Sequence, residues 1–441
     1  VPVFQGNEKA YLNECIDTTF VSSVGKFVDR FEEEMAKYTG AKKAVVCVSG
    51  TNALHMSLML AGVQRDDEVL TQALTFIATC NALSYIGAHP VFIDVDKTTM
   101  GLSPDAMKDW LIKNAEVRET KNIAKADILS HTDYATPQYP LTEDTKACYN
   151  KNTGRRIKAC VPMHTFGHPV RIEEVSALCK EWHIELVEDA AESIGSTYKG
   201  QHTGTFGRIG AISFNGNKTI TTGGGGMLLF NDEELGKYAK HVTTQAKVPH
   251  RWEFRHDHIG YNYRMSNICA GIGRGQMTVL DEHIAHHQHT CQLYKELPAG
   301  VEGIVLHENP SSRFDSNYWL NTILLDPSLH VKGEEHAYET AVQGAVGGAA
   351  GVTHVASSLH TDSEPNRNVE AMRMALDAVG IESRPLWKPM HLQPVYKNNP
   401  RYVNGVSESL FKQGLCLPSG PCVTDEDVAY IVQEIKNSVK K

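Results

Sequence analysis

Apolar and polar positions alternate along the chain in two different rhythms. Short β-branched runs predict strands, and between them apolar residues recur at the spacing of an amphipathic helix. This alternation predicts an α/β fold with a mostly parallel central sheet flanked by helices. The runs that predict strands of this sheet are residues 44–48, 91–95, 159–162, 184–187 and 209–214. Each run ends in small or polar residues, so we expect functional side chains there, because parallel sheets bind ligands at the carboxyl ends of their strands.

The pattern changes after residue 280, where strand-like runs become fewer. Runs at 318–325 and 381–386 are separated by a helical pattern at 368–379. We therefore expect a large domain over residues 1–280 and a smaller C-terminal α/β domain over residues 281–441. Two stretches interrupt the pattern. Residues 116–156 are charged and polar and predict a surface insertion rather than sheet, and the Gly/Ala-rich residues 333–365 predict a flexible excursion without function.

Composition narrows the classes of partner. The 441 residues carry 43 basic and 52 acidic side chains, a net charge of −9, which argues against nucleic acid or an anionic membrane as the main partner. No apolar run approaches the roughly 18 to 20 residues of a membrane span. The first ten residues lack the plan of a signal peptide, so we expect a cytoplasmic protein.

Histidines and cysteines are the candidates for metal ligands. The ten cysteines form no C-x-x-C pair, which leaves no typical zinc or redox motif. Four histidines, His283, His286, His287 and His289, follow one another on an expected helix. A partly exposed polar face is the favoured interpretation, with a transition-metal site as the alternative, and we expect no metal ion.

The first chemical motif is Ser49-Gly50-Thr51-Asn52, between an expected strand and an expected helix. Free backbone N–H groups and the helix dipole make such a turn a binding site for phosphate. The alternative is that Ser49 only caps the helix, which is a common use of serine at this position.

The second motif is the run from Val187 to Glu192, in which an apolar strand delivers Asp189 at its end. A carboxylate this close to the core needs a cationic or hydrogen-bonding partner, and a protonated ring nitrogen would supply one. The alternative is an acidic cluster at the N-terminus of a helix, where the dipole favours it.

The third motif places Lys218 after a strand and before the four glycines Gly223 to Gly226. This position can present an amine to a ligand, with an ordinary surface lysine as the alternative. A P-loop does not fit, because Asn217 separates Gly216 from Lys218. A phosphate site, a carboxylate for a ring nitrogen and an amine are together the groups that pyridoxal phosphate requires.

Six ordered motifs carry a resemblance to a known family. They are Ser49-Gly50-Thr51, residues 75–79, residues 188–191, Ser213-Phe214 with Lys218, residues 260–265 and residues 416–420. With them the chain resembles the DegT/DnrJ/EryC1/StrS sugar aminotransferases, which have the fold of type I pyridoxal-phosphate (PLP) enzymes. The resemblance implies PLP as cofactor and covers most of the chain apart from the two interruptions.

The resemblance also implies roles for particular residues. Lys218 matches the lysine that binds the cofactor covalently and shuttles the proton, and Asp189 matches the acid paired with the ring nitrogen. Phe76 matches the aromatic residue that stacks on the ring. The remaining cofactor-binding positions are Gly50, Thr51, Asn52 and Ser213 at the phosphate, Asn262 at the phosphate of the other subunit, and Glu192.

Two of these positions carry further consequences. A contact from Asn262 to the other subunit's cofactor implies a homodimer with shared active sites, with a tetramer as a further option. Glu192 stands where relatives often carry Gln or His near the phenolic oxygen of the cofactor. Arg208 departs from the Asp that relatives commonly have before the next strand, but it lies outside the cofactor motifs.

Residues 160–169 and 213–226 look most like the branch of the family that acts on UDP-linked 4-keto-6-deoxy-N-acetylhexosamines. This implies transfer of the amino group of L-glutamate to C4 of the sugar. The residues expected at the substrate are His164, Arg264, Lys388 and His391, with Arg384 as a further cation. For Arg384 and Lys388 the alternative is solvated surface.

Other functions stay open at this point. The ketosugar can instead be linked to dTDP or GDP and can be aminated at C3 or C4. A sugar 3-dehydratase of the same fold is disfavoured, because those relatives replace the lysine at position 218 with histidine. A non-catalytic PLP-binding regulator is disfavoured because the chain has no basic helix–turn–helix segment.

Overall fold

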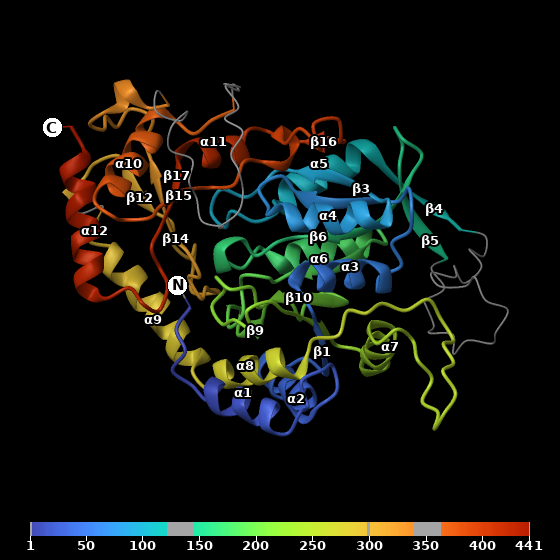
Figure 1. Cartoon of the computed structure of the whole chain (residues 1–441). Helices are drawn as coiled ribbons and strands as arrows, with labels where there is room; N and C mark the ends of the chain where they lie inside the picture. The colour runs from blue at the N-terminus through green and yellow to red at the C-terminus, as the bar shows by residue number, and fades with distance from the viewer. Residues whose placement is uncertain (1, 121–144, 298–299, 339–362, 441) are drawn as a thin grey trace.

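The computed structural model describes residues 2–120, 145–297, 300–338 and 363–440 (Figure 1). Most of the Gly/Ala-rich stretch expected as a flexible excursion lies outside the described residues. In the part of the chain that is described, no helix combines the length and the apolar content needed to cross a bilayer.

A ten-stranded mixed sheet forms the centre of the large domain. Along the sheet run β1 (Lys43–Cys47), β11 (Gly226–Phe230), β10 (Ile209–Ser213), β7 (Glu185–Asp189), β6 (Arg156–Val161), β2 (Glu68–Gln72), β3 (His89–Ile93) and β16 (Arg401–Tyr402). The strands from β10 to β16 are all parallel, whereas β11 pairs antiparallel with both β1 and β10. The mostly parallel sheet predicted from the sequence is confirmed, although β2 and β11 were not among the predicted strands.

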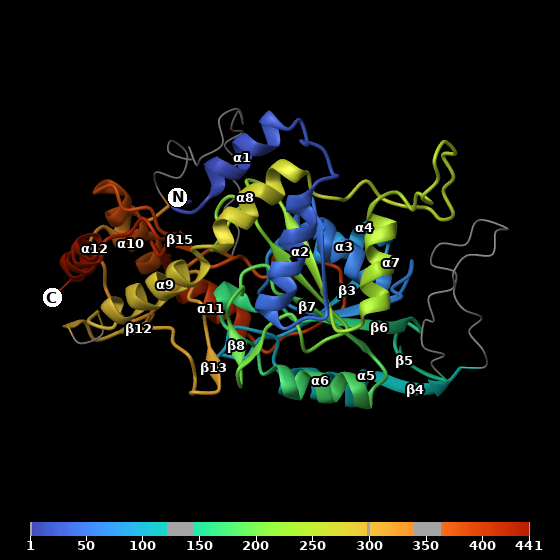
Figure 2. The same cartoon turned by 90° about the horizontal axis from the view of Figure 1, so that it is seen from below.

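Helices bury both faces of this sheet (Figures 1 and 2). One face packs under α3 (Gly50–Leu60), α4 (Ile77–Ile86) and α7 (Glu233–Thr243). The other face packs under α2 (Lys26–Thr39) and α8 (Asn267–Met277) toward β1, and under α5 (Pro104–Asn114) and α6 (Ile172–Glu181) toward β3. The N-terminal helix α1 (Glu8–Asp17) lies against α8. Burial on both faces explains why the strands are apolar runs rather than alternating ones.

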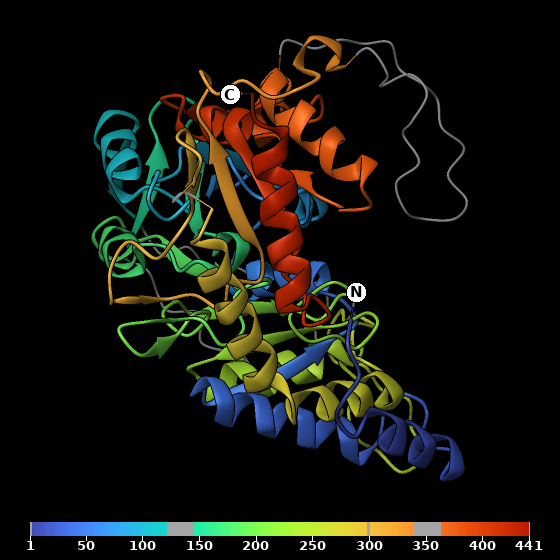
Figure 3. The same cartoon turned by 90° about the vertical axis from the view of Figure 1, so that its left-hand side faces the viewer.

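The smaller domain is built on an antiparallel sheet. Its strands run in the order β12 (Ile304–Leu306), β14 (Asn321–Leu325), β17 (Gly414–Leu417) and β15 (Arg384–Pro385). The core of this domain includes residues of α9 (Leu280–Tyr294), α10 (Arg367–Ala378) and α12 (Asp425–Ser438). Figure 3 shows α12, the red C-terminal helix, lying along this domain.

Strands from the C-terminal part join sheets of the large domain at two places, across the expected boundary near residue 280. The expected boundary falls at the start of α9, but β16 returns from the C-terminal part, with α11 (Val406–Gln413) just after it, and joins the large sheet beside β3. A three-stranded sheet likewise joins β13 (Phe314–Asp315) to β8 (Thr197–Tyr198) and β9 (Gln201–His202). These crossings attach the two domains to each other.

The expectation of a surface insertion over residues 116–156 is wrong at its ends. β4 (Ala115–Glu119) and β5 (Lys146–Asn150) form an antiparallel pair, and β5 also pairs with β6. These strands extend the sheet at its edge, where charged side chains such as Glu116 and Arg118 can face solvent. Residues 121–144, between the two strands, lie outside the described part.

Candidate active site

A cavity of about 780 Å³ lies where the two domains meet. The large domain contributes Phe166 and residues 216–219, among them Lys218, and the smaller domain contributes Trp319, Trp387 and Arg384. A cavity of this size can hold a ligand as large as a cofactor with part of a substrate. These residues of the large domain follow the carboxyl ends of β6 and β10, and the sequence predicts functional side chains at such strand ends.

Lys218 is held in this cavity from two sides. Its ammonium nitrogen lies 2.9 Å from Glu192 Oε1 and 4.0 Å from the centre of the Trp319 ring. The indole N–H of Trp319 in turn donates to the carbonyl of Asn217, at 2.8 Å. The turn that carries the lysine is therefore fixed, and the amine is presented to the cavity.

Asp189 ends β7 and is fully buried. Its carboxylate accepts hydrogen bonds from the Thr79 hydroxyl at 2.7 Å and from the backbone N–H of Ala191 at 3.1 Å. Burial raises the pKa of Asp189, while these two bonds and the nearby charge of Lys218 act in the opposite direction. A cation beside this carboxylate would relieve the burial cost, so the site fits a protonated ring nitrogen.

Glu192 joins the lysine to the backbone of the opposite loop. One carboxylate oxygen accepts from Lys218 Nζ and the other accepts from the N–H of Phe166, both at 2.9 Å. Burial raises the pKa of Glu192 to about 7, although the charge of Lys218 opposes the shift. This carboxyl can therefore change its protonation state near neutral pH.

The expected phosphate turn lies directly against the end of β10. Ser49 caps α3 and accepts the N–H of Asn52, which leaves the first N–H groups of the helix, at Gly50 and Thr51, available to an anion. Gly50 sits so close to β10 that a Cβ there would lie 2.7 Å from the Cβ of Ser213. The fold thus brings the first and third sequence motifs together.

An aromatic cluster lies beside the cavity. Phe76, just before α4, exposes 49% of its surface, and its ring centre lies 5.7 Å from that of Trp387. Trp387 also packs on Phe166 at 4.7 Å. An exposed ring at a strand end is suited to stacking on a flat ligand.

The structure does not bring His164 to the cavity. Its side chain is fully buried, Nε2 lies 3.0 Å from Glu188 Oε2, and Nδ1 accepts the N–H of Val170. Both ring nitrogens are therefore occupied, and the expectation of a direct substrate contact at His164 is corrected to a structural contact. Glu188 also accepts backbone N–H groups from the loop at 204–207, so the pair orders that loop.

Three other residues expected at the substrate, Arg264, Lys388 and His391, do not line this cavity. His391 is buried and pairs with Glu408 at 2.9 Å, and the guanidinium of Arg264 lies 3.6 Å from Asp29. Lys388 follows Trp387 without lining the cavity, whereas Arg384 does line it. Asn262 is exposed and is also absent from the lining.

Sequence reasoning missed three groups that hold the site. Thr79 lies within the motif of residues 75–79, but nothing in the sequence indicates that its hydroxyl contacts Asp189. Trp319 and Trp387 come from the smaller domain, more than 100 residues after Lys218. The only sequence signal for the two tryptophans is that each stands at or next to an end of a run predicted to be a strand of that domain, residues 318–325 and 381–386.

The histidines of α9 differ from expectation. His283 and His287 are buried rather than part of an exposed face, and His283 Nδ1 lies 3.1 Å from the carbonyl of Thr219. Burial lowers the pKa of His287 to about 3, so this side chain is neutral at physiological pH. His283 therefore contacts the loop of Lys218, and His287 lines the cavity.

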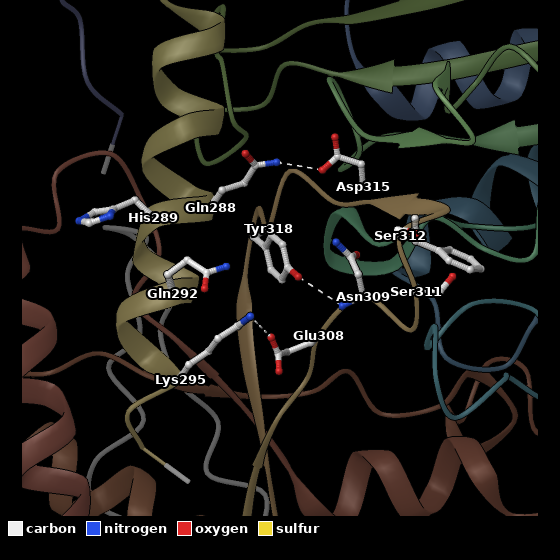
Figure 4. A pocket seen from close by; sticks show the side chains of 11 residues that line it. Gln288, His289, Gln292, Lys295, Glu308, Asn309, Ser311, Ser312, Asp315 and Tyr318 are labelled. Carbon is white, nitrogen blue, oxygen red and sulfur yellow. Dashed lines mark hydrogen bonds and ion pairs between the residues drawn. The ribbon is translucent and has the colours of Figure 1, made fainter. Parts of the chain in front are cut away.

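A second cavity of about 530 Å³ lies between α9 and the strands β12 and β13 (Figure 4). Its polar side chains largely satisfy each other. Lys295 pairs with Glu308, Gln288 donates to Asp315, and the N–H of Asn309 donates to the Tyr318 hydroxyl. None of the residues predicted for the cofactor lines this second cavity, whereas Lys218 lines the first, so the candidate active site is the first cavity.

The site combines an amine, a buried carboxylate and a helix N-terminus at the ends of neighbouring strands, with aromatic side chains on two sides. This combination is typical of a PLP-dependent enzyme of the α/β transferase class. Comparisons with known proteins specify the family. A sequence model of the DegT/DnrJ/EryC1/StrS aminotransferase family matches residues 2–129, 141–346 and 338–436. The chain belongs to this family and is a PLP-dependent sugar aminotransferase.

Individual relatives agree with this assignment. The chain is 33% identical over 436 residues to EpsN of Bacillus subtilis, which carries the name of a pyridoxal phosphate-dependent aminotransferase, covering 98% of this chain and 93% of that one. It is 33% identical over 439 residues to GDP-perosamine synthase of Escherichia coli O157:H7, covering 99% and 97%.

Two further comparisons concern a transaminase named for a UDP-linked sugar and a solved structure. A UDP-4-amino-4,6-dideoxy-N-acetyl-beta-L-altrosamine transaminase of Campylobacter jejuni is 29% identical over 315 residues, which cover 71% of this chain and 68% of that one. The crystal structure of a DegT DnrJ EryC1 StrS aminotransferase from Brucella abortus superposes with a TM-score of 0.75 at 22% identity, covering 98% and 95%.

Proposed function

We propose that the protein transfers the amino group of L-glutamate to C4 of a nucleotide-linked 4-keto-6-deoxy sugar. The observation that carries the proposal is the joint position of Lys218 and Asp189 at the ends of two neighbouring parallel strands, beside the N-terminus of α3. A family of sugar aminotransferases supplies the reaction class, and the cavity at the domain junction supplies room for both partners.

Each residue of the proposed site has a separate role. The ring of the bound PLP supplies an acceptor for the electron pair released when a substrate C–H bond breaks. Asp189 holds the ring nitrogen protonated, Gly50, Thr51 and Ser213 bind the phosphate, and Phe76 stacks on the ring. Lys218 would accept the proton that leaves the amino-bearing carbon of glutamate in the first half of the reaction, and it would deliver a proton to C4 of the sugar in the second half.

Glu192 acts beside the lysine, because it lies within hydrogen-bond distance of the amine. Its carboxyl orients Lys218 toward the cavity and stabilises the charged form of the amine when the amine holds the proton. Asn52 contributes less directly, since its N–H is used by the cap of α3.

We propose UDP-linked 4-keto-6-deoxy-N-acetylhexosamine as the sugar that accepts the amino group, on the similarity of residues 160–169 and 213–226 to that branch. A GDP-linked ketosugar is the second candidate. GDP-perosamine synthase matches nearly the whole chain at 33% identity, whereas the UDP-sugar transaminase matches 71% of it at 29%. Arg384, which lines the cavity, and Lys388 and Arg264, which do not, are the proposed cations for the diphosphate.

The proposed assembly is a homodimer with Asn262 completing the partner's site. Its support is that Asn262 is exposed on a segment whose aromatic side chains Trp252 and Phe254 are 74% and 79% exposed, which is unusual unless another surface covers them. The tetramer and the cytoplasmic location stay predictions from the sequence.

The variant K218A tests the proposed reaction. The protein is loaded with PLP and mixed with L-glutamate and a panel of UDP-, GDP- and dTDP-linked 4-ketosugars, and products are identified by mass and NMR. We expect K218A to lose both the visible absorbance of the bound cofactor and the aminated product, while the surface variant K237A keeps both. Survival of both signals in K218A contradicts the assignment, and turnover of only a GDP-linked sugar replaces the UDP proposal with the GDP one.

A further inference from the structure

Outside the active site, three potential metal ligands converge at the end of α7. His241 lies in the last turn of this helix, and Asp257 and His258 lie in the segment 244–263 that follows it. His241 Nε2 is 2.6 Å and His258 Nδ1 is 2.9 Å from the same oxygen of Asp257. One ligand atom from each residue lies within 4.8 Å of the others, and this is the only such group found in the described residues.

His258 is the part of this cluster that hydrogen bonding does not explain. His258 is only 8% exposed. Its Nδ1 is buried and has no properly oriented hydrogen-bond partner, although Asp257 is near. The rings of Tyr238 and His241 pack edge-on against it and hold it in place. A buried polar atom without a partner is costly in a protein interior, and such atoms often mark a site for an ion or a water.

We propose that His241, Asp257 and His258 bind a divalent transition-metal ion of the zinc type. Two imidazole nitrogens and one carboxylate oxygen are a common ligand set for Zn²⁺, with water as the fourth ligand. Bonds of about 2.0–2.1 Å to tetrahedral Zn²⁺ separate its ligand atoms by about 3.3 Å. The two separations from Asp257, 2.6 Å and 2.9 Å, must widen toward this value, and the two imidazole nitrogens lie within 4.8 Å of each other.

The metal fastens the segment 244–263 to α7. This segment projects beyond α7 as a yellow-green loop (Figures 1 and 2), with exposed aromatic side chains near its tip. Its base is held by the backbone bridges Thr244–Asn262 and Lys247–His256 and by the N–H of Asp257, which donates to Ala246. The ligand cluster stands at this base, so a bound ion orders the segment, which also carries Asn262.

Metal binding is measured on the full-length protein after removal of metals with a chelator. Zn²⁺ is titrated by calorimetry, and Co²⁺ is added as a spectroscopic probe because its visible absorption reports the number and type of ligands. We expect about one ion per chain. The variants D257N and H241N should each weaken binding by about tenfold or more, and H289Q, which changes an exposed histidine paired with Asp425, should bind like the wild type.

Limited proteolysis supplies a second readout that does not depend on aminotransferase activity. Arg251 and Arg255 lie in the segment, so Zn²⁺ should slow tryptic cleavage there in the wild type and in H289Q, but not in D257N or H241N. Circular dichroism identifies a variant that fails to fold, and the other variant then decides. Absence of stoichiometric binding in the wild type, or binding in both D257N and H241N that is as tight as in the wild type, overturns the proposal and leaves a metal-free cluster.

Discussion

At the scale of single residues, the site concentrates buried charge in one place. Asp189, Glu192 and Lys218 meet within a region that excludes most solvent, and each is held by at least one short contact. Burial raises the pKa of both carboxyls, and a cation beside them lowers it. The chain therefore carries two acids that the positive charges of the lysine and of a bound ring can stabilise.

The raised pKa of Glu192 predicts a pH-dependent stability. Its folded pKa of about 7 lies above the ordinary 4.5, so its stabilising contribution is fully present below pH 4.5 and is lost as the pH rises through 7. The loss is on the order of 3 kcal/mol at most. We expect the free energy of unfolding of the cofactor-free protein to fall less between pH 5 and pH 8 in E192Q than in the wild type. Urea unfolding at both pH values measures this, with E282Q, at an exposed position, as the control, and parallel curves for E192Q and the wild type would count against it.

The hydroxyl of Thr79 is predicted to support Asp189. Removing it in T79V leaves a buried carboxylate with one partner fewer, which costs about 1–3 kcal/mol for a bond to a charged group. We expect T79V to unfold at lower urea and to release PLP more readily in equilibrium dialysis. T79S keeps the hydroxyl and loses only the methyl group, so it should stay closer to the wild type than T79V does in both properties. A T79V that unfolds and releases PLP like the wild type would show that the hydrogen bond to Asp189 contributes nothing.

At the scale of elements, the site depends on how closely two turns approach. The N-terminus of α3 touches the end of β10 at Gly50 and Ser213, and the turn after β10 presents Lys218. Strand ends are where short-range sequence patterns are most informative, because glycine, serine and charged residues stand next to apolar runs. For this reason the positions of Ser49–Asn52, Asp189 and Lys218 could be predicted.

Other elements could not be predicted from local pattern. β4 and β5 are charged enough to resemble a loop, and only their pairing along the sheet edge makes them strands. β11 is a fully buried apolar run that follows four glycines, and its antiparallel insertion between β1 and β10 depends on contacts distant in sequence. The tryptophans over Lys218 and the burial of His164 likewise depend on tertiary packing.

Close packing of the phosphate turn gives a prediction at Gly50. In G50A the new methyl group meets Ser213 at 2.7 Å, so α3 must move away from β10. Such overpacking costs about 1–3 kcal/mol, and we expect weaker PLP binding together with lower stability. The matched variant is G224A, where a Cβ has open space. PLP affinity by fluorescence titration separates the two, and equal affinities for G50A and G224A would contradict the proposed phosphate site.

At the scale of the whole molecule, the cavity needs both domains. Lys218 comes from the large domain and the aromatic walls come partly from the smaller one, while β16 and β13 tie the domains together. Asn262 and the exposed aromatics before it lie outside this arrangement. One chain therefore supplies all the contacts described for Lys218 and Asp189. The role proposed for Asn262 requires a second chain.

A heterodimer made from two defective chains tests the shared site. If Asn262 serves the partner's cofactor, K218A paired with N262A contains one site with both defects and one intact site, because a twofold dimer exchanges the residue symmetrically. Co-expression with two different tags and purification on both isolates this heterodimer, and we expect about half of the wild-type turnover per dimer. The control pairs K218A with D189N. Both of these residues belong to the same chain's site, so neither site is intact and no recovery is expected. A K218A/N262A heterodimer no more active than this control would show that each chain forms its site alone.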